Sequence, residues 1–338
     1  MKNNKIMPLI AIVMATYNGE KYIREQLDSI LWQTYENWKL YIRDDGSTDK
    51  TVKIIEEYAM NYPDKILIIK ESNKNYGVCN NFFYTLGFVK EEYVMFCDQD
   101  DVWLKEKIEV TARRMFSVER KNKNIPILVH TDAIVTTEEL EPVNYKINRK
   151  AIFSIKQMIP LKRAYYSRFH DKKTQTTFAN LLLKNSVQGM TIMINRNMSD
   201  YLQRLSEGKL PTCIYHDSLI ASVASIVGVI EFYPAPTVLY RQHTNNNAGA
   251  FSYIWTIFCD MEWSSKLKRV RLYNYLTVNR EKISVLRKLY HEEMTDRQMK
   301  ILNFFRNTPN DWEKFRELGL EKEFTCKQRI LMRIFKIQ

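Results

Sequence analysis

The sequence predicts an α/β protein in which a mostly parallel central sheet is flanked by helices and followed by a C-terminal helical extension. The first strand candidate, Leu9 to Ala15, is apolar at every position, as in a parallel strand that is buried on both faces. Four strand-and-helix repeats follow one another within residues 1–105, and such alternation is typical of a parallel sheet wrapped by helices.

The apolar periodicity gives the order of the elements. In the four repeats, strands are expected at residues 9–15, 38–42, 65–69 and 93–97, and helices at 20–33, 49–61, 81–89 and 105–116. Further strands are expected at 127–130, 186–194, 230–233 and 238–240, with helices at 196–205 and 219–227. We therefore predict a domain over residues 1–250, with halves at 1–105 and 106–250, and a basic helical extension over 251–338.

The composition of the chain excludes several classes of protein. A chain of 338 residues with 45% hydrophobic residues can bury a sizeable core, and only 9 Gly and 9 Pro argue against collagen-like or disordered chains. The five Cys are scattered without a CxxC pair, and no run is long enough for a leader or a membrane span, so a cytoplasmic protein is expected. The net charge of +12 suggests nucleic acid, an anionic membrane or a phosphorylated substrate as partner.

An acidic motif stands at the end of the fourth strand. Asp98, Asp100 and Asp101 directly follow the apolar run that ends at Cys97. Carboxylates at the end of a buried strand are unfavourable unless they are paired, and oxygen ligands suit Mg²⁺ or Mn²⁺ bound together with substrate phosphates. The alternative is an acidic turn in which Asp100 or Asp101 caps the helix that begins near residue 105.

Three polar motifs follow strands of the predicted sheet. They are residues 16–18, 44–47 and 98–101, and ligands bind at the carboxyl ends of parallel strands. Their convergence on one edge favours a ligand site over the helix cap. Neither GxGxxG nor GK[ST] occurs, which gives a dinucleotide fold or a P-loop enzyme little support.

Later polar residues have alternative interpretations. Asp217 in the first turn of a helix can simply interact with the helix dipole, and His243 beside Arg241 can form an anion or metal site. The basic, aromatic residues 163–173 form either a solvated helical insertion or a wall of an acceptor site. Residues 329–337 alternate apolar residues with cations, so the tail can lie in an anionic membrane interface, pack on the main domain, or do both.

Five motifs in this order resemble those of the family-2 glycosyltransferases with the GT-A fold. They are Val13–Asn18, Arg43–Asp49, Phe96–Trp103, His216-Asp217 and Tyr240–His243. The resemblance covers residues 7–250 and is strongest to bacterial enzymes of O-antigen and capsule assembly, often rhamnosyltransferases. Residues 251–338 carry no matching motif. The pair His216-Asp217 departs slightly from the Glu-Asp pair of many relatives.

The resemblance implies roles for residues of each motif. Ala15, Tyr17, Asn18, Asp44, Asp45 and Asp98 would bind the nucleotide, with Tyr17 stacking on the base and Asp45 accepting its N3–H. Asp98, Asp100 and His243 would hold Mg²⁺ or Mn²⁺, with Asp100 the more direct ligand, and Asp217 would be the catalytic base. Contacts to the diphosphate or acceptor would come from Arg241, Gln242, Asp101, Trp103 and His216.

The implied reaction is an inverting sugar transfer, with L-rhamnose from dTDP-rhamnose as first choice and a UDP-hexose or UDP-N-acetylhexosamine as the alternative donor. The expected acceptor is a lipid-linked oligosaccharide at the inner face of the cell membrane, where the protein would be peripheral. A nucleic-acid partner is not expected, and a homodimer is left open. From other classes, a non-catalytic protein that binds anionic membranes or nucleic acid fits the basic tail, whereas a nucleotidyltransferase would need a Gly-rich, Lys-bearing first loop.

Overall fold

The structure is a computed structural model that describes most of the predicted domain and part of the extension. Its described residues are 7–70, 75–142, 144–145, 162–163, 176–183, 185–206, 210–212, 214–244, 246, 279–307 and 311–322. The basic aromatic residues 164–173 and the cationic tail 329–337, for which the sequence suggests alternative roles, lie outside the described residues.

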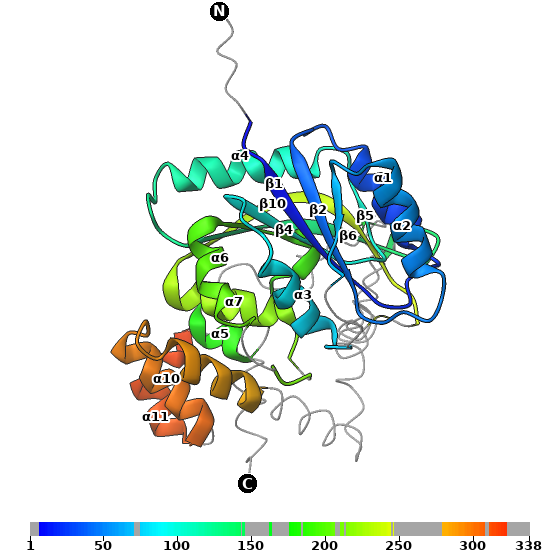
Figure 1. Ribbon diagram of the computed structural model, residues 1–338. Coiled ribbons are helices and arrows are strands. Elements are labelled where there is room, and N and C mark those ends of the chain that lie inside the picture. Colours follow the sequence, from blue (N-terminus) through cyan, green and yellow to red (C-terminus); the bar gives the residue numbers. More distant parts are fainter. Residues whose placement is uncertain are drawn as a thin grey trace, which may run out of the picture.

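An eight-stranded mixed sheet forms the centre of the molecule, in the order β3-β2-β1-β4-β9-β6-β10-β5 (Figure 1). Its strands are β1 Ile10–Thr16, β2 Trp38–Asp44, β3 Ile66–Ile68, β4 Tyr93–Cys97, β5 Val102–Trp103, β6 Ile127–Thr136, β9 Ile192–Asn195 and β10 Val229–Arg241. A separate two-stranded sheet pairs β7 Asn144–Tyr145 with β8 Lys162–Arg163. The predicted α/β class is confirmed.

The second half of the sheet departs from the predicted elements. β9 lies antiparallel between β4 and β6, and it begins only at Ile192 because Gly189–Thr191 form a turn of 3₁₀-helix. The two strands expected at 230–233 and 238–240 are one long strand, β10, whose register with β6 shifts on either side of Pro236. Proline has no N–H to donate to a neighbouring strand, so Pro236 disturbs the sequence pattern by which a strand is predicted. The strand nevertheless continues on both sides of it.

The carboxyl ends of five strands meet at one edge of the sheet. β1 runs parallel to β2 and β4, and β6 runs parallel to β10. Because β9 is antiparallel to both β4 and β6, these two groups of strands point the same way. Thr16, Asp44, Cys97, Thr136 and Arg241 therefore end their strands on the same side of the molecule.

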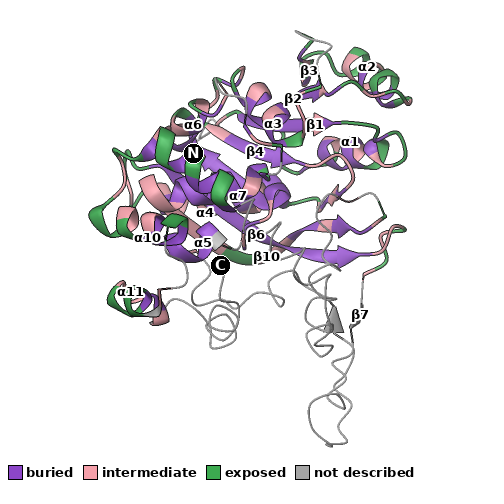
Figure 2. Ribbon diagram, turned by 90° about the horizontal axis from the view of Figure 1, so that it is seen from below, coloured by how far each residue is buried: buried purple, intermediate pink, exposed green. Residues whose placement is uncertain are grey.

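Helices cover both faces of the sheet, and most residues of its central strands β1, β4, β9 and β6 are buried between them (Figure 2). The helices are α1 Ile23–Leu31, α2 Thr51–Asn61, α3 Val78–Leu86, α4 Lys107–Glu119, α5 Phe178–Leu183, α6 Arg196–Gln203, α7 His216–Val227, α10 Asp296–Asn307 and α11 Trp312–Glu317. Alternate residues of β1 point to opposite faces. Ile10, Ile12 and Met14 pack with α1, α2 and α4, whereas Ala11 and Val13 share a cluster with α3, α5, α6 and α7.

The described part of the C-terminal extension packs on the main domain. Residues 279–290 are helical, and Ile283, Leu286 and Tyr290 belong to the hydrophobic cluster that contains Ala11 and Val13 of β1. Figure 1 shows α10 and α11 below α5, and α10 contributes Ile301, among others, to the same cluster. For residues 279–307 and 311–322, packing on the domain is therefore the alternative that the structure supports. No helix within the described ranges is both long and apolar enough to cross a membrane.

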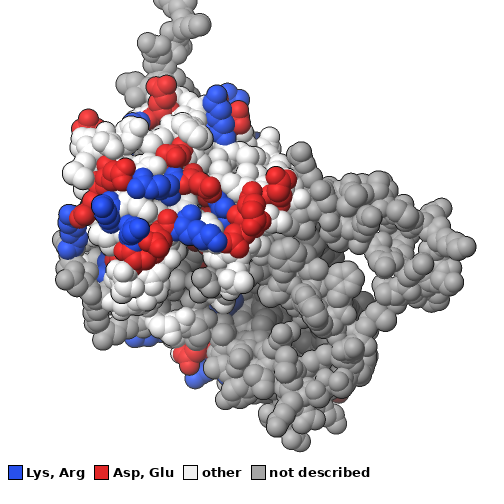
Figure 3. Space-filling view, turned by 90° about the vertical axis from the view of Figure 1, so that its right-hand side faces the viewer, with Lys and Arg blue, Asp and Glu red and all other residues white. Residues whose placement is uncertain are grey.

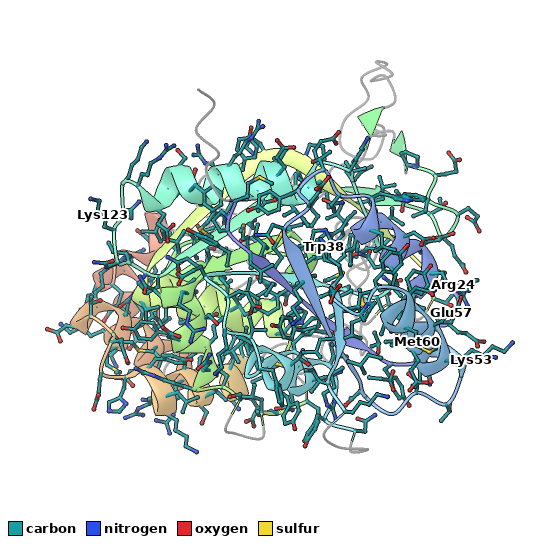
Figure 4. The ribbon with its side chains drawn as sticks, turned by 45° about the horizontal axis from the view of Figure 1, so that its top comes forward. Arg24, Trp38, Lys53, Glu57, Met60 and Lys123 are labelled. Carbon is teal, nitrogen blue, oxygen red and sulfur yellow. The ribbon has the colours of Figure 1, made fainter. Side chains whose placement is uncertain are left out.

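Charges of both signs mix on the outer face of α1 and α2. In the part of this face that is described, Lys and Arg alternate with Asp and Glu (Figure 3). Arg24 of α1 and Glu57 of α2 form an exposed ion pair with 2.8 Å between Nη2 and Oε2, and Figure 4 shows the two side chains next to each other. The high net charge of the chain is thus locally balanced on this face.

Candidate active site

The loops after β1 and β2 interlock through short polar side chains. The hydroxyl of Thr16 donates to Asp44 Oδ1 at 2.9 Å, the backbone N–H of Asn18 donates to Ser47 Oγ at 2.8 Å, and Asn18 Oδ1 accepts from the N–H of Thr48 at 2.8 Å. Asn18 has φ of 47°, in the left-handed region that asparagine tolerates better than most residues. The first two motifs therefore form one rigid unit.

Asp45 is buried within this unit. Its Oδ1 accepts from Arg43 Nη1 at 2.9 Å and from the backbone N–H of Tyr76 at 2.7 Å, and its Oδ2 accepts from the N–H of Gly77 at 2.7 Å. The guanidinium of Arg43 lies over the rings of Tyr76 and Tyr84, 4.4 and 5.1 Å from their centroids. Asp45 thus anchors the segment that leads into α3, while Asp44 organises its own loop by accepting from the N–H groups of residues 46 and 47.

Gln99 connects the first loop to the acidic loop. Its amide makes two hydrogen bonds of 2.9 Å with the backbone of Tyr17, one to the carbonyl and one from the N–H. A Cβ on Gly19 would lie 2.4 Å from Gln99 Oε1, so only glycine leaves room for this contact. Tyr17 is 46% exposed, so it is accessible for stacking on a ligand.

The acidic loop does not cap α4. That helix begins at Lys107, its N-cap is Glu106 and no side chain caps it, so the helix-cap alternative for Asp100 and Asp101 is wrong. Instead Asp100 Oδ2 lies 2.8 Å from His243 Nε2, and Asp101 Oδ1 accepts from the backbone N–H of Arg241 at 3.0 Å. The acidic loop is therefore joined to the end of β10.

Crowded negative charge is the main electrostatic property of this loop. Burial, followed by the charges of Asp100 and Asp217, raises the pKa of Asp98 to about 8. Burial and the two neighbouring carboxylates also raise the pKa of Asp101 well above its usual range, and Asp101 Oδ2 has no hydrogen-bond partner among the described residues. A cation would relieve both effects.

The donor set of the acidic loop suits a hard divalent cation, since carboxylate oxygens are preferred ligands of Mg²⁺ and Mn²⁺. Within the described residues, no three His, Cys, Asp or Glu side chains stand ready as a complete set of ligands. Asp98 and Asp100 with His243 beside them could hold such an ion only together with ligand oxygens from elsewhere. This is the usual way in which Mg²⁺ is bound next to phosphates.

Arg241 is built into the wall of the site. Its side chain is buried, Nε donates to the carbonyl of Asp100 at 2.8 Å, and the other guanidinium nitrogens bond to the carbonyl of Glu138 and the carboxylate of Glu25. The ring of His243 stacks on Tyr22 with 4.6 Å between centroids. These contacts fix the backbone of Asp100 and the ring that faces its carboxylate.

The remaining predicted contact residues near the acidic loop are buried. Trp103 is 2% exposed and the ammonium of Lys107 lies 4.7 Å from its ring centroid, while Gln242 is held by a hydrogen bond of 3.1 Å from its N–H to the carbonyl of Thr136. Ala15 packs against the hydrophobic cluster at the end of β1.

Asp217 lies in the first turn of α7. Its Oδ1 accepts from the N–H of Ser218 at 2.6 Å. Burial raises the pKa of Asp217 to about 6, while the N–H groups of Ser218 and Gly189, the charge of Lys282 and the side chain of Asn185 act to lower it. A carboxylate with a pKa near neutrality is well suited to accept a proton.

His216 fills space beside Asp217. It stacks on Phe82 with 3.9 Å between centroids, and a Cβ on Gly189 would lie 2.3 Å from its Nε2. Burial lowers the pKa of His216 to about 3, so the ring is neutral. Its packing fixes the start of α7 and, with it, the direction of the Asp217 side chain.

Residues 11–178 match the profile of glycosyl transferase family 2. The chain carries a family 2 glycosyltransferase domain. It is similar to the dTDP-rhamnosyl transferase RfbG of Shigella flexneri, with 28% identity over 294 residues, which is 85% of this chain and 88% of the relative. The predicted family is confirmed, and so is glycosyltransferase as the class of enzyme.

Solved structures support the fold of the family 2 domain. The chain is similar to S. aureus TarS 1–349 in complex with UDP-GlcNAc, with a TM-score of 0.51, 17% identity and coverage of 95% of this chain and 77% of that one. It is also similar to the mannosyltransferase PcManGT of Pyrobaculum calidifontis in complex with GDP-Man and Mn²⁺, with a TM-score of 0.52, 16% identity and coverage of 97% and 79%. The expected GT-A fold is thereby confirmed.

The motifs do not reveal several side chains of the candidate site. Arg43 and Gln99 stand inside quoted motifs, but only the folded chain brings them to Asp45 and Tyr17. Lys282 belongs to the extension, for which no motif was available, and an isolated lysine in a basic segment gives no signal. A cavity of about 320 Å³ between α5, α10 and the start of β10 is lined by none of the predicted site residues.

Proposed function

We propose that this protein is an inverting, metal-dependent glycosyltransferase that moves L-rhamnose from dTDP-rhamnose to a lipid-linked oligosaccharide during surface polysaccharide synthesis. The observation that carries the proposal is that carboxylates from two separate elements interact with each other electrostatically. Asp98 and Asp100 follow β4, Asp217 opens α7, and the charge of Asp217 is one of the causes that raise the pKa of Asp98. A site divided in this way suits a reaction with a leaving phosphate on one side and an attacking hydroxyl on the other.

The two sides would have different tasks. A divalent cation held by Asp98 and Asp100, with His243 beside them, would offset the charge that develops on the departing diphosphate. Tyr17 would stack on the nucleobase, and the loops of Asn18, Asp44 and Asp45 would hold the nucleoside in place. Asp217 would take the proton of the acceptor hydroxyl as that hydroxyl attacks the sugar from the face opposite the diphosphate. A single displacement of this kind inverts the anomeric centre.

The donor assignment rests on the rhamnosyl transferase relative, which aligns over most of both chains. UDP-linked glucose, galactose or N-acetylglucosamine is the alternative, because no motif identifies the residues that determine which sugar is bound. The lipid-linked acceptor would bring the protein to the inner face of the cell membrane, where the basic residues of the extension would meet anionic lipids.

Ligand-dependent melting tests the proposal. The full chain is heated with dTDP-rhamnose, UDP-glucose, UDP-galactose or UDP-N-acetylglucosamine, each with Mn²⁺ and with EDTA. A ligand that binds the folded state raises its melting temperature by mass action. We expect a shift with dTDP-rhamnose that requires Mn²⁺. A shift with one UDP-sugar alone would replace the donor, and no shift with any donor would favour a non-catalytic protein that binds membranes or nucleic acid.

A further inference from the structure

A buried lysine reaches the proposed base from the C-terminal helices. Lys282 lies in the helix formed by residues 279–290 and is 2% exposed. Its Nζ donates to the carbonyl of Leu181 in α5 at 2.7 Å and to Ser218 Oγ in α7 at 3.0 Å. Ser218 in turn donates its backbone N–H to Asp217 Oδ1 at 2.6 Å. One residue thus connects the ammonium with the carboxylate.

A buried ammonium is unfavourable unless its charge and its donors are satisfied. Burial lowers the pKa of Lys282 to about 7, and the negative charge of Asp217 acts in the opposite direction. The same pair of charges lowers the pKa of Asp217 against the effect of burial. The two groups are therefore mutually stabilised in their charged forms, with Ser218 between them.

We propose that Lys282 is a positioning residue of the active site, whose ammonium supports the Asp217 carboxylate through Ser218 and thereby makes the C-terminal helices a necessary part of the enzyme. This inference rests on the proposed role of Asp217 as the base. It adds to the site a residue of the C-terminal extension, in which no family motif was found.

Lys282 supplies the positive charge that acts on Asp217. Asp98, Tyr215 and Lys282 are ionisable side chains that interact electrostatically with Asp217. Asp98 and Tyr215 carry no positive charge, and His216 beside them is neutral because burial lowers its pKa. The N–H groups of Ser218 and Gly189 and the amide of Asn185 supply dipoles only.

The test compares neutral and charged replacements in the full chain. Lys282→Met removes the ammonium, and Lys282→Gln removes the charge but can still donate to the carbonyl of Leu181. Lys282→Arg retains the charge. Leu286→Ala is the control, since Leu286 is fully buried one turn further along the same helix and loses only apolar packing. One neutral variant is enough for the test, so the test can still be carried out if the other neutral variant does not fold.

The primary measurement is the titration of Asp217 by ¹³C NMR of aspartate-labelled protein in EDTA, assigned with Asp217→Asn. We expect the midpoint of Asp217 to rise by about one pH unit or more in Lys282→Met and Lys282→Gln, because a nearby opposite charge shifts a pKa by about that amount. It should stay near the wild-type value in Lys282→Arg and Leu286→Ala. An unchanged midpoint in the neutral variants, or an equal shift in Leu286→Ala, overturns the proposal.

A kinetic measurement separates this inference from the proposed function. With a donor that the wild type uses, the neutral variants should lose about fivefold or more in kcat at pH 6, because a rise of about one pH unit leaves roughly a tenth of Asp217 ionised instead of half. The KM for donor should change little. Wild-type protein that transfers no sugar overturns the proposed function, yet the NMR titration still decides whether Lys282 supports Asp217. A KM that rises as much as kcat falls would show that Lys282 shapes donor binding instead, and would overturn the positioning role.

Discussion

The two sides of the active site satisfy their polar groups in opposite ways. In the loops after β1 and β2, the side chains bind one another, and Asp45 has donors on both carboxylate oxygens. In the acidic loop and at the start of α7, carboxylates lie close together. Burial raises the pKa values of Asp98 and Asp217, and the charges of Asp100 and Asp217 raise that of Asp98 further. The side chains of the first side therefore form a scaffold whose polar groups are satisfied. On the second side, the proposed function has Asp98 and Asp100 bind a cation and Asp217 accept a proton.

The comparison predicts that the largest loss of activity follows a change on the crowded side. Asp217→Asn keeps the shape of the side chain but cannot accept the proton, so kcat should fall by roughly 10²–10⁴-fold. Donor binding, measured by the melting shift, should be retained because the scaffold loops are untouched. Turnover close to that of the wild type would contradict the assignment of Asp217 as base.

On the scaffold side, the largest effect should be on stability. Arg43→Met leaves Asp45 without its buried ion pair, in which the two side chains are 1% and 4% exposed, and breaking such a pair costs about 3–5 kcal/mol. The free energy of unfolding from urea titration measures this loss. Arg24→Met is the control, because the Arg24–Glu57 pair is about half exposed and should contribute far less. Equal losses in the two variants would refute the scaffold interpretation.

The pH dependence of the reaction is the next effect in size. A carboxyl is protonated below its pKa, and burial raises the pKa of Asp217 to about 6. The wild-type kcat should therefore be constant well above pH 6 and fall about tenfold for each pH unit below it. A profile of kcat that stays flat down to pH 4.5 would show that another group accepts the proton.

The smallest effect concerns the contact that joins the two sides. Gln99→Ala removes two hydrogen bonds to the backbone of Tyr17, each contributing about 1 kcal/mol. Gly19→Ala should disturb the same contact, because the added Cβ would meet Gln99 Oε1. Both variants should raise the KM for donor by roughly fivefold and leave kcat nearly unchanged. An effect in only one of them would mean that this contact does not position Tyr17.

The sequence predicts the scaffold half of the fold closely, because its strands are continuous apolar runs bounded by polar turns. The predicted strand at residues 93–97 coincides with β4, and the predicted first strand differs from β1 by one residue at each end. The later half was harder to predict, since Pro236 interrupts β10 and the turn at Gly189–Thr191 delays β9.

The residues of the candidate site also differ in how well the sequence predicts them. Asp100 can be selected because it directly follows a buried strand, and Asp217 and His243 because the motifs around them resemble those of the family. The partners Arg43, Gln99 and Lys282 cannot, because their contacts depend on tertiary packing between elements far apart in the chain. Lys282 is the clearest case: it approaches Ser218 across 64 residues of sequence.

One measurement tests most directly whether the acidic loop binds the donor together with a metal ion. It is the shift in melting temperature that the donor causes in the wild type and in Asp100→Asn, each with Mn²⁺ and with EDTA. We expect a shift in the wild type that EDTA abolishes, and little shift in Asp100→Asn under either condition. An equal shift with Mn²⁺ and with EDTA, retained in Asp100→Asn, would contradict this expectation, because the acidic loop would then take no part in holding the diphosphate.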